Sequence, residues 1–370
     1  MMKRALAAVA LLAASPVAAA EPPPPVWHGI WRGTIGNAPV LVCLDGSRDW
    51  KRGSYYYLKR LTPIRLDWDS SQARWNEMSV QDKVQATLHF DKIAASRIVG
   101  RWTGGGKSLA LTFDRVAAQT NEDFGLCGSI NYIRPRLGAP RVIETRGANN
   151  GVAYRKLALA LPPSFRSVTI ESFALAGRST AIDRINRELA KPLTFAGMAD
   201  GWIDCMRGNL AAHGVDGDYS ESLTPGMIGP RYLTVDHHSD GFCGGAHPYS
   251  GNNSRTFDLA SGAEIDLNDL LTARAIIRKR YDGTIDEAKM VSPAFRAVIL
   301  AGWKHSDGAC QESFERADFW DIALTRTGLN FTPSLAHVEQ ACGDAIPISF
   351  ARLGPWLNAK GKAAVAALPR

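Results

Sequence analysis

Six cysteines, spread along the whole chain, constrain its fold more than any other feature. They are Cys43, Cys127, Cys205, Cys243, Cys310 and Cys342. No two of them have the CxxC spacing that zinc ribbons and thioredoxin-like sites use. An even number of cysteines in an exported protein is typical of a disulfide framework, so we expect three disulfides if the chain leaves the cytoplasm.

The first twenty residues predict that it does. Lys3 and Arg4 form a short basic segment, and residues 5–12 are apolar but too short to span a bilayer. Alanines at 18–20 offer a small-residue cleavage site, so cleavage near Ala20 would leave Glu21 as the first mature residue. No later apolar run reaches the roughly 18 residues that a transmembrane helix needs. We therefore expect a protein of the periplasm, or a secreted one, without a transmembrane segment.

The charge of the chain argues against a nucleic-acid partner. The formal net charge is +7, and loss of Lys3 and Arg4 with the leader removes two of these positive charges. The remaining basic residues are scattered and form no Lys/Arg run of the kind that binds nucleic acid. An anionic envelope polymer or a membrane surface remains open as a weak partner, and the oligomeric state is not indicated.

The mature N-terminal part, residues 21–120, reads as a β-rich domain. Short runs such as APVLVCL, GSYYYLKR, QATLHF and SLALTF are separated by glycine, aspartate and serine turns. This spacing is typical of a small antiparallel β-barrel or sandwich.

After a proline- and glycine-rich stretch at 121–150, expected as a linker, the segment 151–370 mixes strands and helices. RKLALALP, SVTIESFAL, YLTVDHH, FWDIALT and AIPISF read as strands. Helices are predicted at 179–189, from Leu267 to Lys279, around 294–303 and from Leu353 onward. The chain is therefore expected to be α+β, with a mixed C-terminal domain built on an antiparallel sheet.

This organisation favours one set of disulfides among the many that six cysteines permit. Only Cys43 and Cys127 lie in the N-terminal half, so we expect them to pair. Locality in the sequence favours Cys205 with Cys243 and Cys310 with Cys342, although the pairing of these four stays open.

Several ordered motifs of the C-terminal half resemble a known extracytoplasmic module. They are DRINREL, YLTVDHH, CGGAH, TFDLASGAEIDLNDLL, FWDIALTRTGLNF and DAIPISFARLGPWL. In this order they resemble the domain of the lysozyme-responsive anti-sigma factor, which also occurs beside some peptidoglycan deacetylases. The N-terminal part is more loosely similar to β-domains that precede such modules in exported proteins.

The resemblance implies a binding domain of the cell envelope. This chain lacks the membrane helix and sigma-binding segment of the anti-sigma factor, and it lacks the metal motifs of the deacetylase domain. Members that sense lysozyme bind a strongly cationic protein, which the net positive charge of this chain would repel at long range. An acidic patch of Asp216, Asp218 and Glu221 could overcome that repulsion locally.

The CGGAH motif supplies the candidate ligand-binding residues. His247 follows Gly244 and Gly245, whose freedom of backbone conformation can present an imidazole at a turn. Asp236 and Tyr249 lie on the strands before and after it and complete the set. A structural role for the His247 ring, in which it bonds the backbone of the turn, is the alternative.

Catalytic signatures are weak. His237 and His238 are adjacent on a strand, so they point to opposite faces and cannot easily share a metal. No HExxH, GxSxG or SxxK motif occurs. We therefore expect no catalytic residue, metal or cofactor, and interpret the chain as a non-catalytic binding protein for a lysozyme-like hydrolase or a peptidoglycan glycan. The alternative is a peptidoglycan-acting hydrolase or deacetylase-like enzyme that uses His247 and a nearby aspartate.

Overall fold

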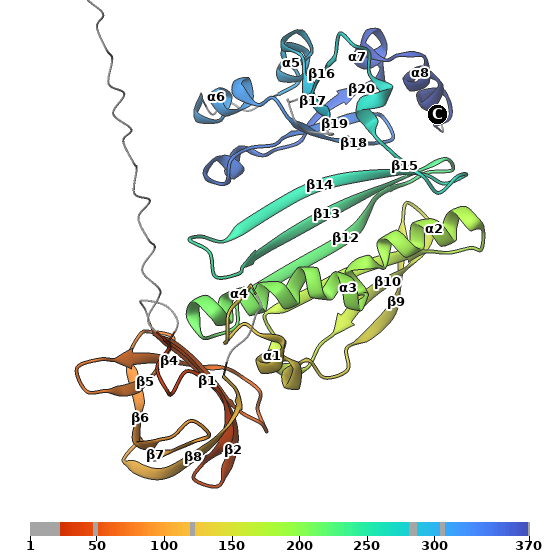
Figure 1. Ribbon diagram of the computed structural model, residues 1–370. Coiled ribbons are helices and arrows are strands. Elements are labelled where there is room, and N and C mark those ends of the chain that lie inside the picture. Colours follow the sequence, from red (N-terminus) through yellow and green to blue (C-terminus); the bar gives the residue numbers. More distant parts are fainter. Residues whose placement is uncertain (1–22, 47–50, 119–122, 281–286, 304–307, 369–370) are drawn as a thin grey trace, which may run out of the picture.

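The computed structural model describes residues 23–46, 51–118, 123–280, 287–303 and 308–368. A β-barrel, a large sheet carrying helices, and a smaller C-terminal unit follow one another along the molecule in chain order (Figure 1). The expected leader at 1–20 lies outside the described residues. Within the described part, no helix is long and apolar enough to cross a membrane.

The N-terminal unit is a closed antiparallel barrel of eight strands, which confirms the expected barrel. Each strand pairs with the next, and β1 pairs with β8 to close the ring. The strands are β1 (Gly29–Ile35), β2 (Ala38–Asp45), β3 (Arg52–Tyr57), β4 (Ile64–Asp69), β5 (Arg74–Met78), β6 (Val84–Ile93), β7 (Arg97–Gly104) and β8 (Lys107–Ala117).

Strand β2 is buried on both of its faces. Val40 and Val42 point into the barrel, where they pack with Trp31. Leu41 and Cys43, which alternate with them, point outward and pack against residues that follow the barrel. This two-sided burial explains why APVLVCL is a nearly continuous apolar run rather than an alternating one.

A buried ion pair joins the barrel to the rest of the chain. Arg136 lies in the last turn of helix α1 (Ile130–Leu137), and its side chain is 0% exposed. Its guanidinium donates to both carboxylate oxygens of Asp216, at 2.8 and 2.5 Å, and its Nε donates to the carbonyl oxygen of Leu61 in the β3–β4 loop at 2.7 Å. Nearby, the Tyr56 hydroxyl of β3 donates to the Tyr132 carbonyl of α1 at 2.7 Å. These bonds hold α1 against the outer wall of the barrel.

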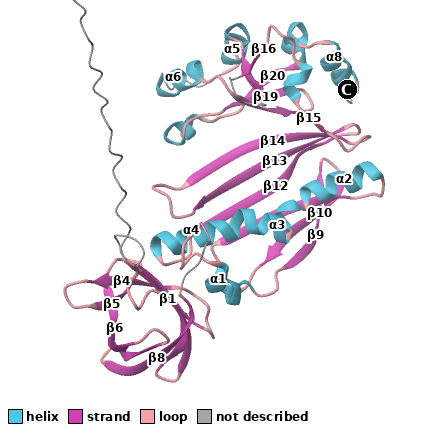
Figure 2. Cartoon of the chain, in the orientation of Figure 1, coloured by secondary structure: helices cyan, strands magenta, loops and turns pink. Residues whose placement is uncertain are grey.

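A seven-stranded sheet forms the middle of the molecule, in the order β15-β14-β13-β12-β11-β10-β9 (Figure 2). Its strands are β9 (Arg141–Asn149), β10 (Val152–Ala160), β11 (Val168–Leu175), β12 (Asp218–Ile228), β13 (Tyr232–Phe242), β14 (Tyr249–Asp258) and β15 (Glu264–Ile265). All neighbours are antiparallel except β11 and β12, which are parallel. The sheet is therefore mixed at one position, and the overall α+β prediction is confirmed.

The parallel pair requires a crossover, and helices supply it. They are α2 (Thr180–Leu189), α3 (Phe195–Met198) and α4 (Asp204–His213), joined by the short turns η2 (Lys191–Leu193) and η3 (Ala199–Ile203). The predicted helix at 179–189 is confirmed: the Ser179 hydroxyl caps α2 by accepting from the amide of Ile182 at 3.1 Å. Ile185 and Leu189 bury its apolar face against the sheet.

The C-terminal unit packs helices on two small sheets. Its strands are β16 (Ile276–Arg280) with β17 (Glu287–Val291), and β18 (Trp320–Leu324), β19 (Gly328–Pro333) and β20 (Ile346–Ser349). Its helices are α5 (Pro293–Leu300), α6 (Gly308–Arg316), α7 (Phe350–Leu353) and α8 (Ala359–Ala366). The remaining short turns of the chain are η1 (Pro163–Phe165), η4 (Leu267–Leu270), η5 (His337–Cys342) and η6 (Gly354–Trp356).

The helix predicted from Leu267 to Lys279 is wrong. Asp266 does cap a helical turn, by accepting from the Asn268 amide at 2.9 Å, but only η4 follows. The chain then enters β16, where Ile276 is buried against Val291 and Ile277 is exposed. Ile276 and Ile277 are β-branched, which favours a strand, and neighbouring side chains of a strand point to opposite faces, so one can be buried while the other is exposed.

The predicted terminal helix is interrupted. Residues 350–353 form α7, and Pro355 falls in η6 before α8 begins at Ala359. Proline cannot donate an amide hydrogen to a helix and restricts the residue before it, so the chain breaks here.

The stretch 121–150, expected as a linker, contributes α1 and β9 to the described structure. Strand β9 forms the edge of the large sheet and pairs along its full length with β10. The proposed domain limits at 120 and 150 remain predictions, since the barrel and the following unit share one apolar cluster.

The three disulfides join Cys43 to Cys127, Cys205 to Cys243, and Cys310 to Cys342. The first ties β2 to the segment before α1, so it reinforces the junction at the barrel wall. The second ties α4 to the end of β13, and the third ties α6 to η5.

Replacing Arg136 by methionine should destabilise the protein by about 3 to 5 kcal/mol, because it leaves the Asp216 carboxylate buried without its partner. Urea unfolding of the oxidised protein measures this change. Adding Asp216→Leu should recover much of the loss, since the pair is then replaced by apolar groups. Arg184→Met, on the exposed side of α2, is the control and should change stability by less than about 0.5 kcal/mol. Equal losses of stability in Arg136→Met and Arg184→Met would contradict the assigned role of the Arg136–Asp216 pair.

Candidate functional site

His247 lies in the turn that connects β13 to β14, and its side chain is exposed. Its Nδ1 atom lies 2.9 Å from the carbonyl oxygen of Pro248. The ring therefore bonds the backbone of its own turn, as in the structural alternative stated for it.

The two glycines of this turn differ in their surroundings. Gly244 has a φ of +91°, and a Cβ atom there would lie 2.7 Å from the carbonyl oxygen of Gly208 on α4. The close approach of the turn to α4, which the Cys205–Cys243 disulfide secures, thus requires glycine. Gly245 is exposed and has open space around it.

Asp236 and Tyr249 lie on opposite faces of the sheet. Leu233 and Val235 of β13 pack with α2, so residues of the same parity belong to what we call the helix face. Tyr249 pairs with Gly241 and lies on this helix face, whereas Asp236 lies on the face toward the C-terminal unit. The structure therefore does not bring the five predicted residues together at one point.

Instead, the helix face brings together a second set of polar residues, here called the helix-face cluster: Tyr219, Glu221, His237, Tyr249 and Asn253. The Tyr219 hydroxyl donates to Glu221 Oε2 at 2.9 Å, and His237 Nε2 lies 3.1 Å from Glu221 Oε1. His237 Nδ1 lies 3.0 Å from Asn253 Oδ1. The Tyr249 ring lies 6.5 Å from the Tyr219 ring.

A kink between α3 and α4 covers part of this cluster. Gly201 in η3 has φ −108° and ψ −112°, outside the helical region. A Cβ atom at Gly201 would lie 3.1 Å from the Tyr219 hydroxyl oxygen. The helix layer thus touches the cluster through backbone, and it leaves Tyr249 partly exposed.

Ionisation in the cluster is strongly biased. Burial opposes the charged form of Glu221, but hydrogen bonds from His237 and Tyr219 outweigh it and hold the pKa of its carboxyl below the usual value. Burial, together with the negative charges of Glu221, Asp240 and Asp218, raises the pKa of Tyr249 to about 12. Burial and Glu221 likewise raise the pKa of Tyr219. The two tyrosines therefore stay neutral beside a carboxylate that stays charged.

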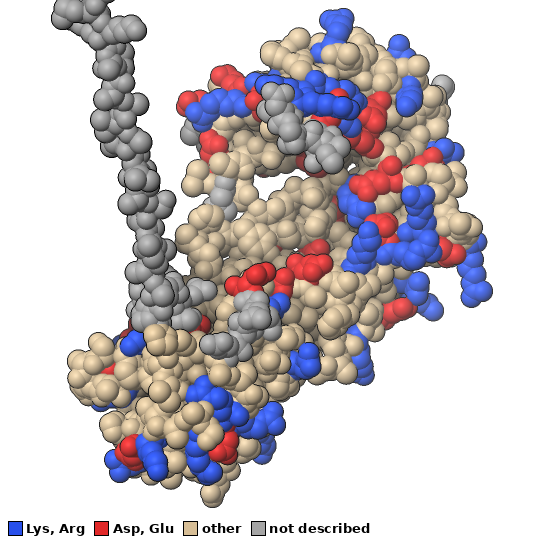
Figure 3. All heavy atoms as spheres, in the orientation of Figure 1, with Lys and Arg blue, Asp and Glu red and all other residues tan. Residues whose placement is uncertain are grey.

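The surface around this region is locally acidic. Figure 3 shows acidic side chains in the middle of the molecule, and basic side chains on the barrel, on the C-terminal unit and at one end of the large sheet. The three carboxylates that act on Tyr249 contribute negative potential here. The predicted patch of Asp216, Asp218 and Glu221 needs correction, because Asp216 is buried against Arg136 and cannot contribute.

On the opposite face of the sheet, Asp236 and Asp321 both accept hydrogen bonds from Ser254. The Ser254 amide donates to Asp321 Oδ1 at 3.0 Å, and its hydroxyl donates to Asp236 Oδ1 at 3.3 Å. Burial raises the pKa of both carboxyls, and the charge of Asp236 contributes to the rise at Asp321. These two carboxyls therefore hold protons more readily than ordinary aspartates do.

The histidines do not assemble a metal site. His238 bonds Asp240 and Asn252 on the C-terminal side, at 3.0 and 2.7 Å, while His237 bonds the helix-face cluster. Among the residues that the structure describes, no group of three histidine, cysteine, aspartate or glutamate side chains could hold a metal ion.

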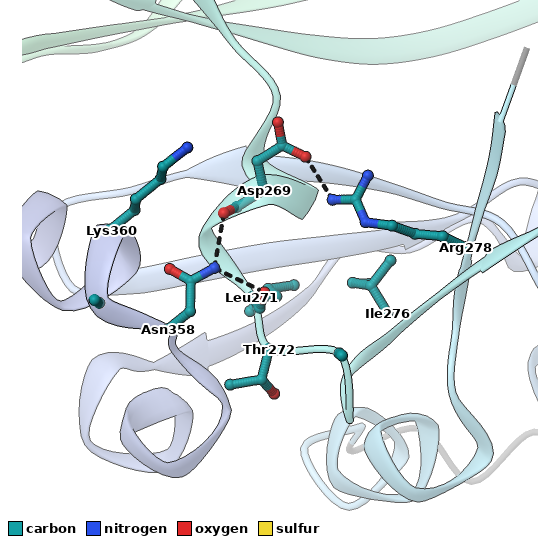
Figure 4. Close-up of a pocket in the computed structure, with 9 residues that line it drawn as sticks. Asp269, Leu271, Thr272, Ile276, Arg278, Asn358 and Lys360 are labelled. Carbon is teal, nitrogen blue, oxygen red and sulfur yellow. Dashed lines mark hydrogen bonds and ion pairs between the residues drawn. The ribbon is translucent and has the colours of Figure 1, made fainter.

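A pocket lies in the C-terminal unit, between η4, β16 and α8 (Figure 4). Asn358 donates to the carbonyl oxygens of Asp269 and Leu271 at 2.8 and 2.9 Å, and Arg278 donates to the Asp269 carboxylate at 2.6 Å. Most of its polar groups therefore hold the pocket wall together and are not available to a ligand.

No protein-family model matches this chain, and no curated protein matches it. Among solved structures, a DUF3298 family protein from Pseudomonas aeruginosa PAO1 is 16% identical, with a TM-score of 0.35 over 60% of this chain and 94% of that one. A DUF3298 family member from Bacteroides fragilis NCTC 9343 is 10% identical, with a TM-score of 0.39 over 63% and 98%. These structural neighbours are DUF3298 family proteins, whereas the likeness to the anti-sigma factor stays a resemblance in the sequence.

Sequence reasoning missed Tyr219 and assigned Glu221 only to an acidic patch. A usable signal was present: in YSESL, Tyr219, Glu221 and Leu223 stand at every second position, so in a strand they share one face. The pairing of β12 with β13 was needed to bring them to His237.

Glu221→Gln should lower stability near neutral pH by about 1.5 to 3 kcal/mol, the range for hydrogen bonds to a charged group. Because folding depresses the pKa of Glu221, its contribution is present above the ordinary glutamate pKa and is lost as the pH falls through the folded value. Urea unfolding of both proteins between pH 7 and pH 3 should show their difference shrinking toward low pH. A difference that stays constant over this range would contradict the assignment.

Proposed function

We propose that this protein is an exported, non-catalytic binding protein of the cell envelope, and that its partner is a cationic protein of the lysozyme type. The contact surface is the hairpin end of the large sheet around Tyr249, where Tyr219 and Glu221 lie on the helix face and Asp218 and Asp240 lie on the other face of the same strands. The basic leader segment with its small-residue cleavage site, together with three disulfides, supports export.

The observation that carries the proposal is the local charge at Tyr249. Carboxylates of Glu221, Asp240 and Asp218 all act on this ring, although the chain as a whole is basic. A cationic partner is repelled at long range by the net charge but attracted at this point, so docking there is orientation-specific. Tyrosine is also enriched in the buried centres of protein interfaces.

The rigidity of the surface supports binding rather than turnover. Glu221 and His237 are fixed by hydrogen bonds to one another and to neighbouring side chains. The Cys205–Cys243 disulfide anchors the adjoining turn to α4. A preorganised surface loses little conformational entropy on association.

Purified oxidised protein should bind c-type lysozyme at low salt, and the triple variant Asp218→Asn, Asp240→Asn, Tyr249→Ala should bind at least about tenfold more weakly. Calorimetric titration measures both affinities, and raising the salt should weaken wild-type binding. Asp183→Asn, which removes an exposed carboxylate of α2, is the matched control.

Sedimentation with purified peptidoglycan forms the second arm of the test. If the protein sediments with peptidoglycan but does not bind lysozyme, its partner is a glycan and not a cationic protein. If neither ligand retains the protein at low salt, the binding proposal fails.

A second candidate is hydrolysis of a peptidoglycan bond, which the Asp236–Ser254–Asp321 arrangement favours over a site at His247. Glycosidases use two carboxyl groups, one of them kept protonated by a raised pKa, and both carboxyls here have raised pKa values. Release of muropeptides from peptidoglycan, abolished by Asp236→Asn and by Asp321→Asn but retained by His247→Ala, would establish this activity instead.

A further inference from the structure

The two ends of the barrel differ. Trp27, Trp68 and Trp75 close one end, with ring centroids of Trp27 at 5.4 and 5.1 Å from those of Trp68 and Trp75. Lys51 lies over the Trp27 and Trp68 rings at 5.8 and 5.4 Å from their centroids. A ligand therefore has no entry among these tryptophans.

The opposite end opens into a cavity of about 750 Å³, here called the barrel mouth. It lies where β2 begins, β3 ends and β4 begins, and η1 of the following unit forms its outer wall. Its lining residues are Ala38, Tyr57, Arg60, Thr62, Ile64, Pro163 and Arg166. The volume falls in the range of small-molecule sites, and eight-stranded barrels are wide enough to hold one small ligand.

The inner wall of the barrel mouth is apolar. Ala38, Tyr57 and Ile64 have the same strand parity as the interior residues Val40 and Leu66, so they face inward. Pro163 adds an apolar surface from outside the barrel. A hydrocarbon or aromatic group is therefore the chemistry that this wall would accept.

The rim of the barrel mouth is cationic. Arg60 and Arg166 are both exposed, and neither forms a salt bridge with any carboxylate in the described parts of the chain. Most other arginines around the barrel, such as Arg65, are paired with acidic side chains. Two uncompensated guanidinium groups favour a carboxylate or phosphate, which arginine binds with paired hydrogen bonds.

Within the barrel, Glu77 limits how deep an anion can go. Its Oε2 atom accepts from the Tyr55 hydroxyl at 2.7 Å and from the Trp102 indole at 2.9 Å. Tyr55 is two residues from Tyr57 on the same inward face, so this carboxylate lies behind the barrel mouth. An anionic head group is consequently favoured at the rim, and only an uncharged tail suits the interior.

The loop that presents Arg60 and Thr62 is held in a strained conformation. Leu61 has a φ of +61°, in the left-handed region that leucine rarely adopts. Arg136 donates to the carbonyl oxygen of Leu61, and the Leu61 side chain packs on the apolar cluster at the barrel wall. Strain that the surrounding structure maintains in this way is characteristic of binding loops.

From these observations we infer that the barrel mouth binds a small amphipathic anion, with its carboxylate or phosphate between Arg60 and Arg166 and its apolar part against Tyr57 and Ile64. This site is independent of the surface at Tyr249. It assigns the barrel a ligand class of its own, either a free fatty acid or the head group and one chain of an anionic lipid.

Calorimetric titration of the oxidised protein with monomeric dodecanoate, dodecyl phosphate and dodecanol tests this inference. The two anions should bind, and dodecanol should bind at least about tenfold more weakly, because it lacks the charge that the arginines recognise. Arg60→Ala with Arg166→Ala should remove that preference, whereas Arg60→Lys with Arg166→Lys should keep part of it. Arg184→Ala should bind as the wild type does, because Arg184 is also exposed and forms no ion pair with the residues that the structure describes.

Ala38→Trp fills the cavity from a half-buried position on the inner wall and should abolish binding of all three ligands while the thermal unfolding temperature stays near the wild-type value. Equal binding of dodecanoate and dodecanol, or unchanged binding by Ala38→Trp, would overturn the inference. Lysophosphatidylglycerol distinguishes the sources: tighter binding than dodecanoate assigns a lipid, and weaker binding assigns a free fatty acid.

Discussion

The buried pair of Arg136 and Asp216 is the interaction on which the arrangement of this molecule depends. Removing both charges from water is costly: burial raises the pKa of Asp216, although the guanidinium makes paired bonds to the carboxylate and a third bond to the Leu61 carbonyl. The guanidinium also lies 4.6 Å from the centre of the Phe165 ring. One side chain thereby fixes α1, the β3–β4 loop, η1 and the start of β12 in a single geometry.

The large sheet separates two kinds of chemistry because side chains alternate along its strands. On β13, His237 faces the helices and joins Glu221, while Asp236 faces the C-terminal unit and joins Ser254. The His237–Glu221 cluster and the Asp236–Ser254 cluster therefore lie in different environments, although His237 and Asp236 are adjacent in sequence. The first holds a carboxylate charged, and the second makes carboxyls easier to protonate.

Much of the fold follows from the sequence, because local patterns specify local structure. The alternating runs of the barrel, the capped helix at Ser179 and the strand YLTVDHH all carry their own signals. Strand β9 does not: its residues are mostly exposed, so it carries no apolar alternation, and the proline and glycine content of 121–150 predicts a linker there instead. The helix predicted after Asp266 failed because β16 is stabilised by its partner β17, which local pattern does not reveal.

The candidate site was harder to predict for the same reason. Glycine and histidine in CGGAH marked a turn correctly, but a turn needs such residues for its own geometry, and Gly244 is required by contact with α4. The helix-face cluster depends on three strands in register, so its members carry no short motif.

The barrel mouth and the contact between the barrel and α1 are linked at the Leu61 loop. The Leu61 carbonyl oxygen accepts from Arg136, and Leu61 lies between the two residues, Arg60 and Thr62, that line the mouth. A ligand that binds only the folded mouth stabilises the folded state by mass action, and it thereby favours the loop geometry that Arg136 requires. Conversely, loss of Arg136 would release the strained loop and disorder the rim. The buried ion pair therefore holds in place both the α1 contact and the loop that carries Arg60 and Thr62.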